Sequence, residues 1–487
     1  MSLTTALSIA QQSLRSTSLQ TSTVSRNVTD ANNPDYTRRN AVVSSEAPGS
    51  RVITIQRASN DALFRANLSA VSSYEGQATV RVGLDRLTQS VNGVDNATSP
   101  ATAIGSLYEA LQLFATTPSN ASLAENAIDA ARQVVRSLND GTSAIQASRA
   151  DADMQISIAV GELNTLLRDF EQTNKAIVTG TQAGRDVNDE LDKRDALLKK
   201  IAVYVPVSSF TRANQDMVIT TTGGAVLFET VPRAVTFQPQ PGYTANTTGN
   251  PIYIDGVQLP AGSGGNTDGA GKLSGLLQLR DTVAPAMQAQ LDEIARGLVN
   301  AFAETDPTGG ALPALAGLFT WSGGPALPAA GTVSPGLAWS ISINAAMDTS
   351  AGGSPLLLRD GGANGAGYVA NTAGVASYSA LLISYGDKLD EPMAFDPAAG
   401  AGSTASVMVY SASAISWLEN LRQQTATGEE TKAALLTRTA TALSSETGVN
   451  VDQELSLLLE LEHSYEASAR LIRAVDEMLA SLLAAIR

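Results

Sequence analysis

Hydrophobic residues near the N-terminus recur at alternating steps of four and three. The repeat runs through Leu3, Leu7, Ala10, Leu14, Thr17, Thr21, Val24 and Val28. This spacing of 3.5 residues is typical of coiled-coil helices rather than of helices packed on a globular core. It predicts a helix at the start of the chain that packs lengthwise on another helix.

The same repeat returns near the C-terminus and is more strongly apolar there. Its members are Leu455, Leu458, Tyr465, Ala469, Ile472, Val475, Leu479, Leu482 and Ile486, with Glu462 in one polar place. The short step from Ile472 to Val475 breaks the heptad, which would locally overwind a coiled coil without ending it. A helix over 451–486 would be about 54 Å long.

These two repeats need a partner, because a large apolar side chain contributes ~1.5–3 kcal/mol when it is buried. We call Leu3, Leu7, Ala10, Leu14, Val24 and Val28, together with the C-terminal members, the assembly seam. Residues 1–40 carry a net charge of +2 and residues 451–487 a net charge of −4, which favours pairing of the two ends. Two alternatives stay open: a bundle closed within one chain, or ends that are loose in the monomer and fold on assembly.

Between the ends, helical and β patterns alternate. A β-hairpin is predicted over 41–57, with its turn at Pro48–Gly49. Helical patterns cover 60–91, 104–114, 119–200, 273–303 and 406–443. Residues 201–260 have the Val and Thr content of a sheet, and Gly and Pro in 305–404 indicate loops and short strands. The fold class is therefore mainly α with β-rich insertions.

Composition removes several classes of function. The chain has 487 residues, a net charge of −15, no cysteine and a single histidine, His463. Its acidity argues against nucleic acid as the main partner. Disulfides, thiolate zinc sites and cysteine nucleophiles are excluded, as are sites built from several histidines of one subunit. No apolar segment follows Arg15 as in a cleaved signal, and no run approaches the ~18 apolar residues of a membrane span.

Candidate catalytic and binding motifs fail on inspection. A phosphate loop ending at Gly271–Lys272 would need a glycine at Asn266 and a hydroxyl at Leu273. His463 has no nucleophile pattern near it, so a surface or packing role is favoured. We therefore predict no catalytic residue, no cofactor and no metal, and no enzymatic activity.

Four aspartates recur every third residue, at Asp186, Asp189, Asp192 and Asp195. A hard cation such as Ca²⁺ would accept such oxygens. However, Lys193, Arg194 and Lys199 follow acids by four residues, so ion pairs along one solvated helix are the favoured interpretation.

Two terminal motifs resemble those of a known family. The segment 27–38, NVTDANNPDYTR, is similar to the N-terminal signature of the flagellar axial proteins of the rod, hook and hook–filament junction. Asn27, Tyr36 and Arg38 match it, whereas Asp35 stands where glycine is usual. The segment 448–483, which includes Asn450, resembles the tail that these proteins share.

Two internal motifs narrow the resemblance. NDELDKRDAL, from Asn188 through Asp195 to Leu197, and GLLQLRD, which ends with Arg280 and Asp281, look like marks of the hook-associated members. Hook and rod proteins lack them. The resemblance implies a structural component that forms the junction layer between hook and filament by assembly through its terminal helices.

The resemblance also implies a domain plan and partners. Residues 1–45 and 447–487 would form a terminal coiled-coil core domain. Residues 46–200, 271–304 and 405–446 would form a helical rod-like domain, and 201–270 with 305–404 a β-rich outer region. The chain would leave the cytoplasm through the flagellar export apparatus, after a cytosolic export chaperone has bound its C-terminal helix. In the flagellum its partners would be copies of itself in a ring layer, hook protein below and a second junction protein above. Nucleic acid and membrane are not expected partners. The alternatives are another axial component, such as a hook or distal-rod protein, or an enzyme carried in 201–404.

Overall fold

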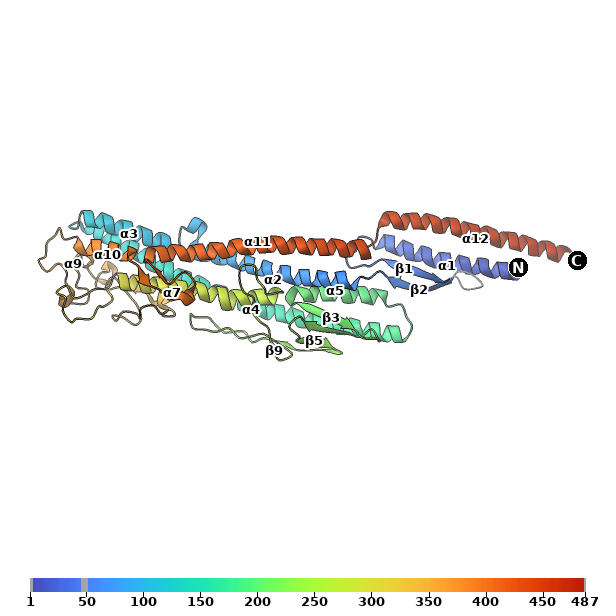
Figure 1. Ribbon diagram of the computed structural model, residues 1–487, viewed down its shortest axis with the longest axis horizontal. Helices are drawn as coiled ribbons and strands as arrows, with labels where there is room; N and C mark the ends of the chain where they lie inside the picture. Colours follow the sequence, from blue (N-terminus) through green and yellow to red (C-terminus); the bar gives the residue numbers. More distant parts are fainter. Residues whose placement is uncertain (1–2, 45–50, 486–487) are drawn as a thin grey trace.

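The computed structural model describes residues 3–44 and 51–485, which form a long rod with both chain ends at one tip (Figure 1). Helices α1 (Leu3–Thr29) and α12 (Val451–Ala485) lie side by side and antiparallel at this tip. We call these two helices the terminal pair and residues 58–447 the rod. Among the described residues, no helix is long and apolar enough to cross a membrane.

The rod is built on helix α4 (Ala121–Gln182), which spans about 93 Å at 1.5 Å per residue. Helix α2 starts where the sequence predicts, because Asn60 Oδ1 accepts a hydrogen bond from Leu63 N at 3.1 Å and caps it. The helices that pack with α4 include α2 (Asp61–Asn92), α3 (Pro100–Thr116), α5 (Asn188–Tyr204), α6 (Lys272–Gln278), the π-helical turn Leu279–Val283 and α7 (Ala284–Ala301). Helix α11 (Val407–Thr447) packs mainly on α2.

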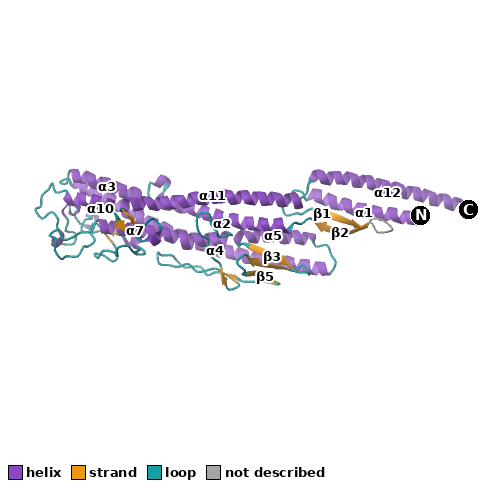
Figure 2. Ribbon diagram, in the orientation of Figure 1, coloured by secondary structure: helices purple, strands orange, loops and turns teal. Residues whose placement is uncertain are grey.

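Small antiparallel sheets are inserted between these helices (Figure 2). Strands β1 (Arg39–Ser44) and β2 (Arg51–Arg57) form the predicted hairpin, with Ala41 opposite Ile55. Its predicted turn at Pro48–Gly49 lies outside the described residues. One sheet has the order β3 (Val207–Thr211), β4 (Met217–Thr221), β5 (Val226–Glu229), β6 (Val231–Pro232); a second has β7 (Val235–Thr236), β8 (Tyr253–Ile254), β9 (Val257–Gln258).

Residues 305–404 cover the end of the rod far from the termini and contain less strand than their composition led us to expect. Buried acids hold the loops there instead: Glu304 accepts hydrogen bonds from Ala363 N and Asn364 N, both at 2.9 Å. The elements are β10 (Phe319–Thr320), α8 (Leu337–Ser340), β11 (Ser342–Ile343), α9 (Leu357–Asp360), α10 (Ala380–Asp390), β12 (Met393–Ala394), β13 (Thr404–Ala405) and 3₁₀ turns at Thr349–Ala351, Ala366–Tyr368 and Pro397–Ala399, with another at Val94–Asn96 outside this region.

Apolar side chains fill the rod along its length. One core gathers α2, α3, α7, α11 and the first half of α4, where Phe114 and Ile128 are fully buried. A second core joins the second half of α4 to α5 and the β3–β6 sheet, where the Phe170 and Phe228 rings meet edge to face at 5.0 Å. The predicted fold class is confirmed: a mainly helical chain with small β insertions and paired terminal helices.

Candidate assembly site

The inward side of α1 follows the predicted repeat. Ala10, Thr17 and Val24 are buried against the neighbouring elements, and Leu3, Leu7, Leu14 and Val28 are half-buried. Small residues at this side allow a close approach of the two helices, and Ser13 Oγ lies 3.1 Å from Ser468 Oγ. The assembly role of these seam residues stays a prediction.

On α12 the heptad has a different phase from the expected one. Glu454, Leu461, Ser468 and Val475 point toward α1 at regular steps of seven, with Leu458, Ile472 and Leu479 half-buried between them. The repeat therefore continues through Ile472 and Val475 without a break. The predicted repeat placed Leu455, Glu462 and Ala469 inward instead, each one residue after the residue that does point inward. Glu454 and Ser468 are polar and therefore did not suggest an inward position.

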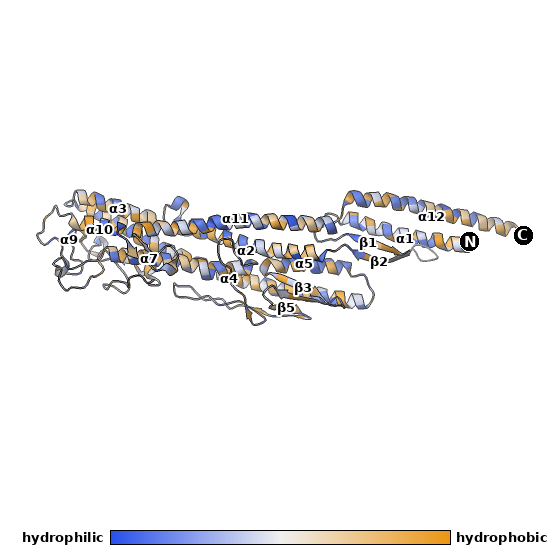
Figure 3. Ribbon diagram, viewed as in Figure 1, coloured by the Kyte–Doolittle hydropathy of each residue, from blue (hydrophilic) through white to orange (hydrophobic). Residues whose placement is uncertain are grey.

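The consequence is an exposed apolar strip on α12. In the single chain, the strip keeps large side chains about half exposed, including the predicted seam residues Leu455, Tyr465 and Leu482; Ala469 is half-buried and Ile486 lies outside the described residues. Figure 3 shows hydrophobic residues recurring along α12 up to its C-terminal end. We call the following residues the α12 flank: Leu455, Leu459, Tyr465, Leu471, Met478, Leu482 and Leu483. They lie on both sides of the line of residues that faces α1, and large exposed apolar residues gathered along one helix mark interaction surfaces.

A buried polar cluster joins the two terminal helices where they meet the rod. Asn27, fully buried, donates through Nδ2 to Glu454 Oε2 at 2.9 Å and accepts at Oδ1 from the Tyr36 hydroxyl at 2.8 Å. Arg38 Nε donates to Glu454 Oε1 at 2.5 Å. Burial raises the pKa of Tyr36 to about 12, so its hydroxyl keeps its proton and remains a donor. We call Asn27, Tyr36, Arg38 and Glu454 the knot.

The knot brings together the N-terminal motif and the C-terminal tail, which are more than four hundred residues apart. Asn450 completes it by capping α12, since its Oδ1 accepts from Asp452 N at 3.1 Å and Gln453 N at 3.2 Å. Glu454 was missed as a site residue. Its signal was a carboxylate that occupies a heptad core position, where an unpaired charge would be costly.

The aspartates of α5 are paired, but not along their own helix as expected. Arg26 contacts Asp189 at 2.7 Å, Arg39 contacts Asp192 at 2.5 Å, and Arg57 contacts Asp195 at 2.7 Å and Asp192 at 3.1 Å. All three arginines belong to the N-terminal segment. We call these six residues the ionic clasp. The hydrogen bond from Arg26 lowers the pKa of Asp189, whereas burial raises the pKa of Asp195.

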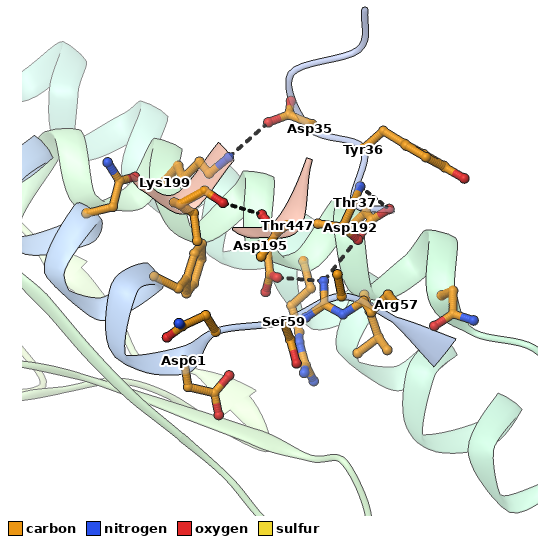
Figure 4. A pocket seen from close by; sticks show the side chains of 18 of the residues that line it. Asp35, Tyr36, Thr37, Arg57, Ser59, Asp61, Asp192, Asp195, Lys199 and Thr447 are labelled. Carbon is orange, nitrogen blue, oxygen red and sulfur yellow. Dashed lines mark hydrogen bonds and ion pairs between the residues drawn. The ribbon is translucent and has the colours of Figure 1, made fainter. Parts of the chain in front are cut away.

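Three residues of the clasp, Arg57, Asp192 and Asp195, line a cavity of about 1190 Å³ beside the segments that link the terminal pair to the rod (Figure 4). Asn188 also lines this cavity, and its Nδ2 donates to Ile55 O at 3.0 Å. On another side, Lys199 reaches Asp35 at 3.5 Å. In the described part of the chain, no three acidic or histidine side chains are placed to hold a metal ion.

We call the place where the terminal pair meets the rod the joint. Arg280 and Asp281 lie away from it, in the π-helical turn of the rod. Arg280 is fully buried and contacts Asp153 Oδ1 at 2.7 Å, Asp281 at 2.8 Å and Asn250 O at 2.7 Å. Asp153 also accepts from the Tyr243 hydroxyl at 2.6 Å. This second cluster fixes the loop around 240–250 on α4. His463 is exposed on α12.

Comparison with known proteins gives two matches to family models. Residues 84–317 match the model described as the flagellar hook-associated protein FlgK helical domain. Residues 443–485 match the C-terminal model of the flagellar basal body rod FlgEFG proteins. The first match contains both internal motifs, with Asn188, Asp195, Arg280 and Asp281, and the second contains Asn450.

Two individual proteins are similar to the chain. Flagellar hook-associated protein 1 of Escherichia coli (strain K12) is 25% identical over 319 residues, which are 60% of this chain and 55% of that protein. The chain thus matches little more than half the length of this relative. The flagellar hook junction protein FlgK from Burkholderia pseudomallei has the same fold, with a TM-score of 0.56, 13% identity, and coverage of 78% of this chain and 100% of that one.

The two family models make the chain similar to the flagellar axial class of proteins. Within that class it is FlgK-like, and similar to flagellar hook-associated protein 1.

Proposed function

We propose that this protein is a structural, non-enzymatic component of the bacterial flagellum that forms the junction layer between hook and filament. The observation that carries this proposal is the match of residues 84–317 to the FlgK helical domain. The C-terminal model is named for basal body rod proteins and does not separate a junction protein from a hook or rod protein. The helical-domain model is specific to the hook-associated member.

Assembly proceeds through the terminal helices. In the single chain α1 covers one side of α12, and the α12 flank keeps Leu471, Met478 and Leu483 half exposed or more. A neighbouring copy in the same layer buries this flank. Hook protein below and a second junction protein above complete the set of axial partners, and an export chaperone covers the flank in the cytoplasm before the chain is exported. The chain is divided into a terminal coiled-coil core domain (1–45 and 447–487), a helical rod-like domain (46–200, 271–304 and 405–446) and a β-rich outer region (201–270 and 305–404).

The flank allows a sharper test than the half-buried seam residues. Replacing Leu458 and Leu479 with Asp would block incorporation, but these side chains also pack against α1. Leu471→Asp and Met478→Asp change residues that the single chain leaves exposed, so the chain should fold as before while incorporation into the flagellum is lost. Ala480→Asp is the matched control, since Ala480 is exposed on α12 and the helical spacing places it on the opposite side from Leu471 and Met478.

Incorporation is measured in the native bacterium with the chromosomal copy deleted, by detecting each variant in isolated hook–filament preparations and by swarming. Gold labelling of the wild-type protein should mark the boundary between hook and filament. Labelling along the hook or in the rod would favour another axial component instead. Normal filaments with the Leu471→Asp, Met478→Asp double variant would contradict assembly through the flank.

An enzyme carried in 201–404 remains the alternative from another class. It would need a pocket in that region with convergent titratable groups. The large cavity lies at the joint, and residues 209–217 of that region form only part of its lining. The buried acids of the outer region, such as Glu304, bind backbone N–H groups of neighbouring loops. The axial role therefore accounts for more of the chain.

A further inference from the structure

The chain changes direction at the joint without a continuous helix through it. Helix α11 ends at Thr447, Gly448 is extended at φ −80° and ψ 174°, and α12 starts at Val451. On the N-terminal side, a coil joins α1 to the β1–β2 hairpin. Beside these links lies the cavity of about 1190 Å³, lined by both the terminal segments and the rod. One backbone hydrogen bond crosses the joint, from Arg38 N to Thr447 O at 2.8 Å, and the other polar links across it come from side chains.

The polar contacts at the joint fall into two groups with different roles. Those of the knot connect α1 to α12 and are insulated from solvent at Asn27 and Glu454, both fully buried. Those of the clasp connect the N-terminal segment to α5, which belongs to the rod. The knot thus holds the pair together. The clasp holds α1, through Arg26, and the β1–β2 hairpin that packs on α1, through Arg39 and Arg57, against α5 of the rod.

The side chains of the clasp become less exposed from its outer end toward its centre. At its outer end, Arg26 and Asp189 keep side-chain exposures of 47% and 58%, so dissolved ions screen this pair. At its centre, Asp192 is 9% exposed and Arg39 only 2%. Asp192 also accepts from Arg57 at 3.1 Å and from Thr37 Oγ1 at 2.5 Å. Asp192 is therefore the residue on which most of the clasp converges.

The helix that carries the acids favours their charged form. Asp189 and Asp192 lie in the first turns of α5, where the partial positive charge of the helix N-terminus stabilises carboxylates. The spacing of three residues places Asp189, Asp192 and Asp195 on one side of the helix. Cations from three separate positions of the N-terminal segment, Arg26, Arg39 and Arg57, meet this side.

We propose that the ionic clasp sets the angle between the terminal pair and the rod, and that loss of its charge lets the pair swing over the neighbouring cavity as a unit held by the knot. The isolated chain has this property whether or not it belongs to a hook–filament junction. A subunit of this design adapts its inner helices to neighbours at different tilts while the rod stays unchanged.

The absence of cysteine from the chain allows clean spin labelling for distance measurement. Cysteines at Thr437 on α11 and Ala467 on α12, both exposed, report on the angle across the joint. Thr437 with Thr165 reports on the rod, and Ser18 with Ala467 on the terminal pair. In Asp192→Asn the distance distribution across the joint should broaden roughly twofold, as for a released hinge, while both control pairs keep their distributions.

Asp169→Asn, which removes an exposed acid of α4 that has no ion pair, is the matched control and should change none of the three distributions. Salt tests the same idea without a substitution: at about 1 M, where the Debye length is ~3 Å, the unsubstituted chain should broaden across the joint in the same sense, though less than Asp192→Asn. Unchanged distributions across the joint in both Asp192→Asn and high salt would overturn the proposal, as would broadening of the terminal-pair distances to the same extent. If Asp192→Asn fails to fold, the salt series alone decides.

Discussion

The rod and the terminal pair use the same helical building block but differ in how completely they cover it. In the rod, α4 is surrounded by α2, α3, α5 and α7, and side chains such as Ile128, Leu163 and Phe170 are fully buried. In the terminal pair, the buried residues described on α12 are Glu454, Leu461 and Val475. Burial of apolar area is the main stabilising term in folding. We therefore expect the rod to be stable by itself and the terminal pair to gain much of its stability from a neighbour.

The difference also explains where polar residues are used. In the rod, buried charges such as Arg280 with Asp153 and Arg296 with Glu293 fix loops on helices. In the terminal pair, Glu454 and Asn27 fix the register of two helices whose apolar contact is thin. A polar residue at one core position is a known way to specify coiled-coil register at some cost in stability.

The largest contrast is expected from truncating one apolar residue in each part. Phe170→Ala should lower the free energy of unfolding of the rod by about 3–5 kcal/mol, because it leaves a cavity against Phe228. Leu471→Ala, on the exposed flank, should change it by less than ~0.5 kcal/mol. Chemical denaturation followed by circular dichroism measures both; equal losses would remove the contrast.

The buried charges of the rod give the next test. Arg280→Ala leaves Asp153 buried with its charge no longer balanced, which should cost about 3–5 kcal/mol. Its control is Arg168→Ala, because Arg168 lies on α4, the rod's central helix, and its side chain is exposed to solvent. A loss in the control as large as in Arg280→Ala would show that the effect is not one of burial. Thermal unfolding of the two variants side by side is sufficient.

In the terminal pair, Glu454→Ala should separate α1 from α12 without harming the rod. The substitution removes the acceptor of both Asn27 and Arg38. It leaves one N–H of the buried Asn27 amide without an acceptor, while the amide still donates to Arg39 O at 3.0 Å. We expect amide exchange in α1 and α12 to accelerate roughly tenfold or more, with α4 unchanged. Glu460→Ala, on the exposed side of α12, is the control. Acceleration in α4 would mean that the two parts are not independent.

A further effect concerns pH and the outer end of the rod. Burial raises the pKa of Asp292 to about 6, although Ala338 N and Gly336 N donate to its carboxylate. The folded state therefore binds more protons than the unfolded state between pH ~4 and ~6, so this residue favours folding at low pH and that contribution is lost as the pH rises through 6. Relative to Asp292→Asn, the wild-type chain should lose up to ~3 kcal/mol across this interval. A constant difference between the two unfolding curves would contradict the raised pKa.

Much of the helical frame could be predicted from local signals. Asn60 caps α2 where the pattern begins, and the long helical tracts follow their apolar periodicity. Asn27, Tyr36 and Arg38 were singled out by resemblance, and the structure gathers them in one cluster. The heptad phase of α12 could not be read, because the inward residues Glu454 and Ser468 are polar and the outward Leu455 is apolar.

The ion pairs of the clasp and the arrangement of the outer loops could not be predicted from the sequence, for a different reason. Arg26 and Asp189 are 163 residues apart, and an aspartate run offers closer lysines on its own helix as apparent partners. Only the packing of the β1–β2 hairpin beside α5 selects the distant arginines. In 305–404, glycine and proline indicate turns, but which buried acid receives which loop is decided by tertiary packing.

Amide exchange of the isolated chain compared with the assembled flagellar junction tests the central claim most directly. The account predicts that α1 and α12 exchange much faster than α4 and α7 in the isolated chain, and become as slow as the rod once neighbouring copies cover the α12 flank. Terminal helices that are already as protected as α4 in the isolated chain, with no further slowing on assembly, would contradict it.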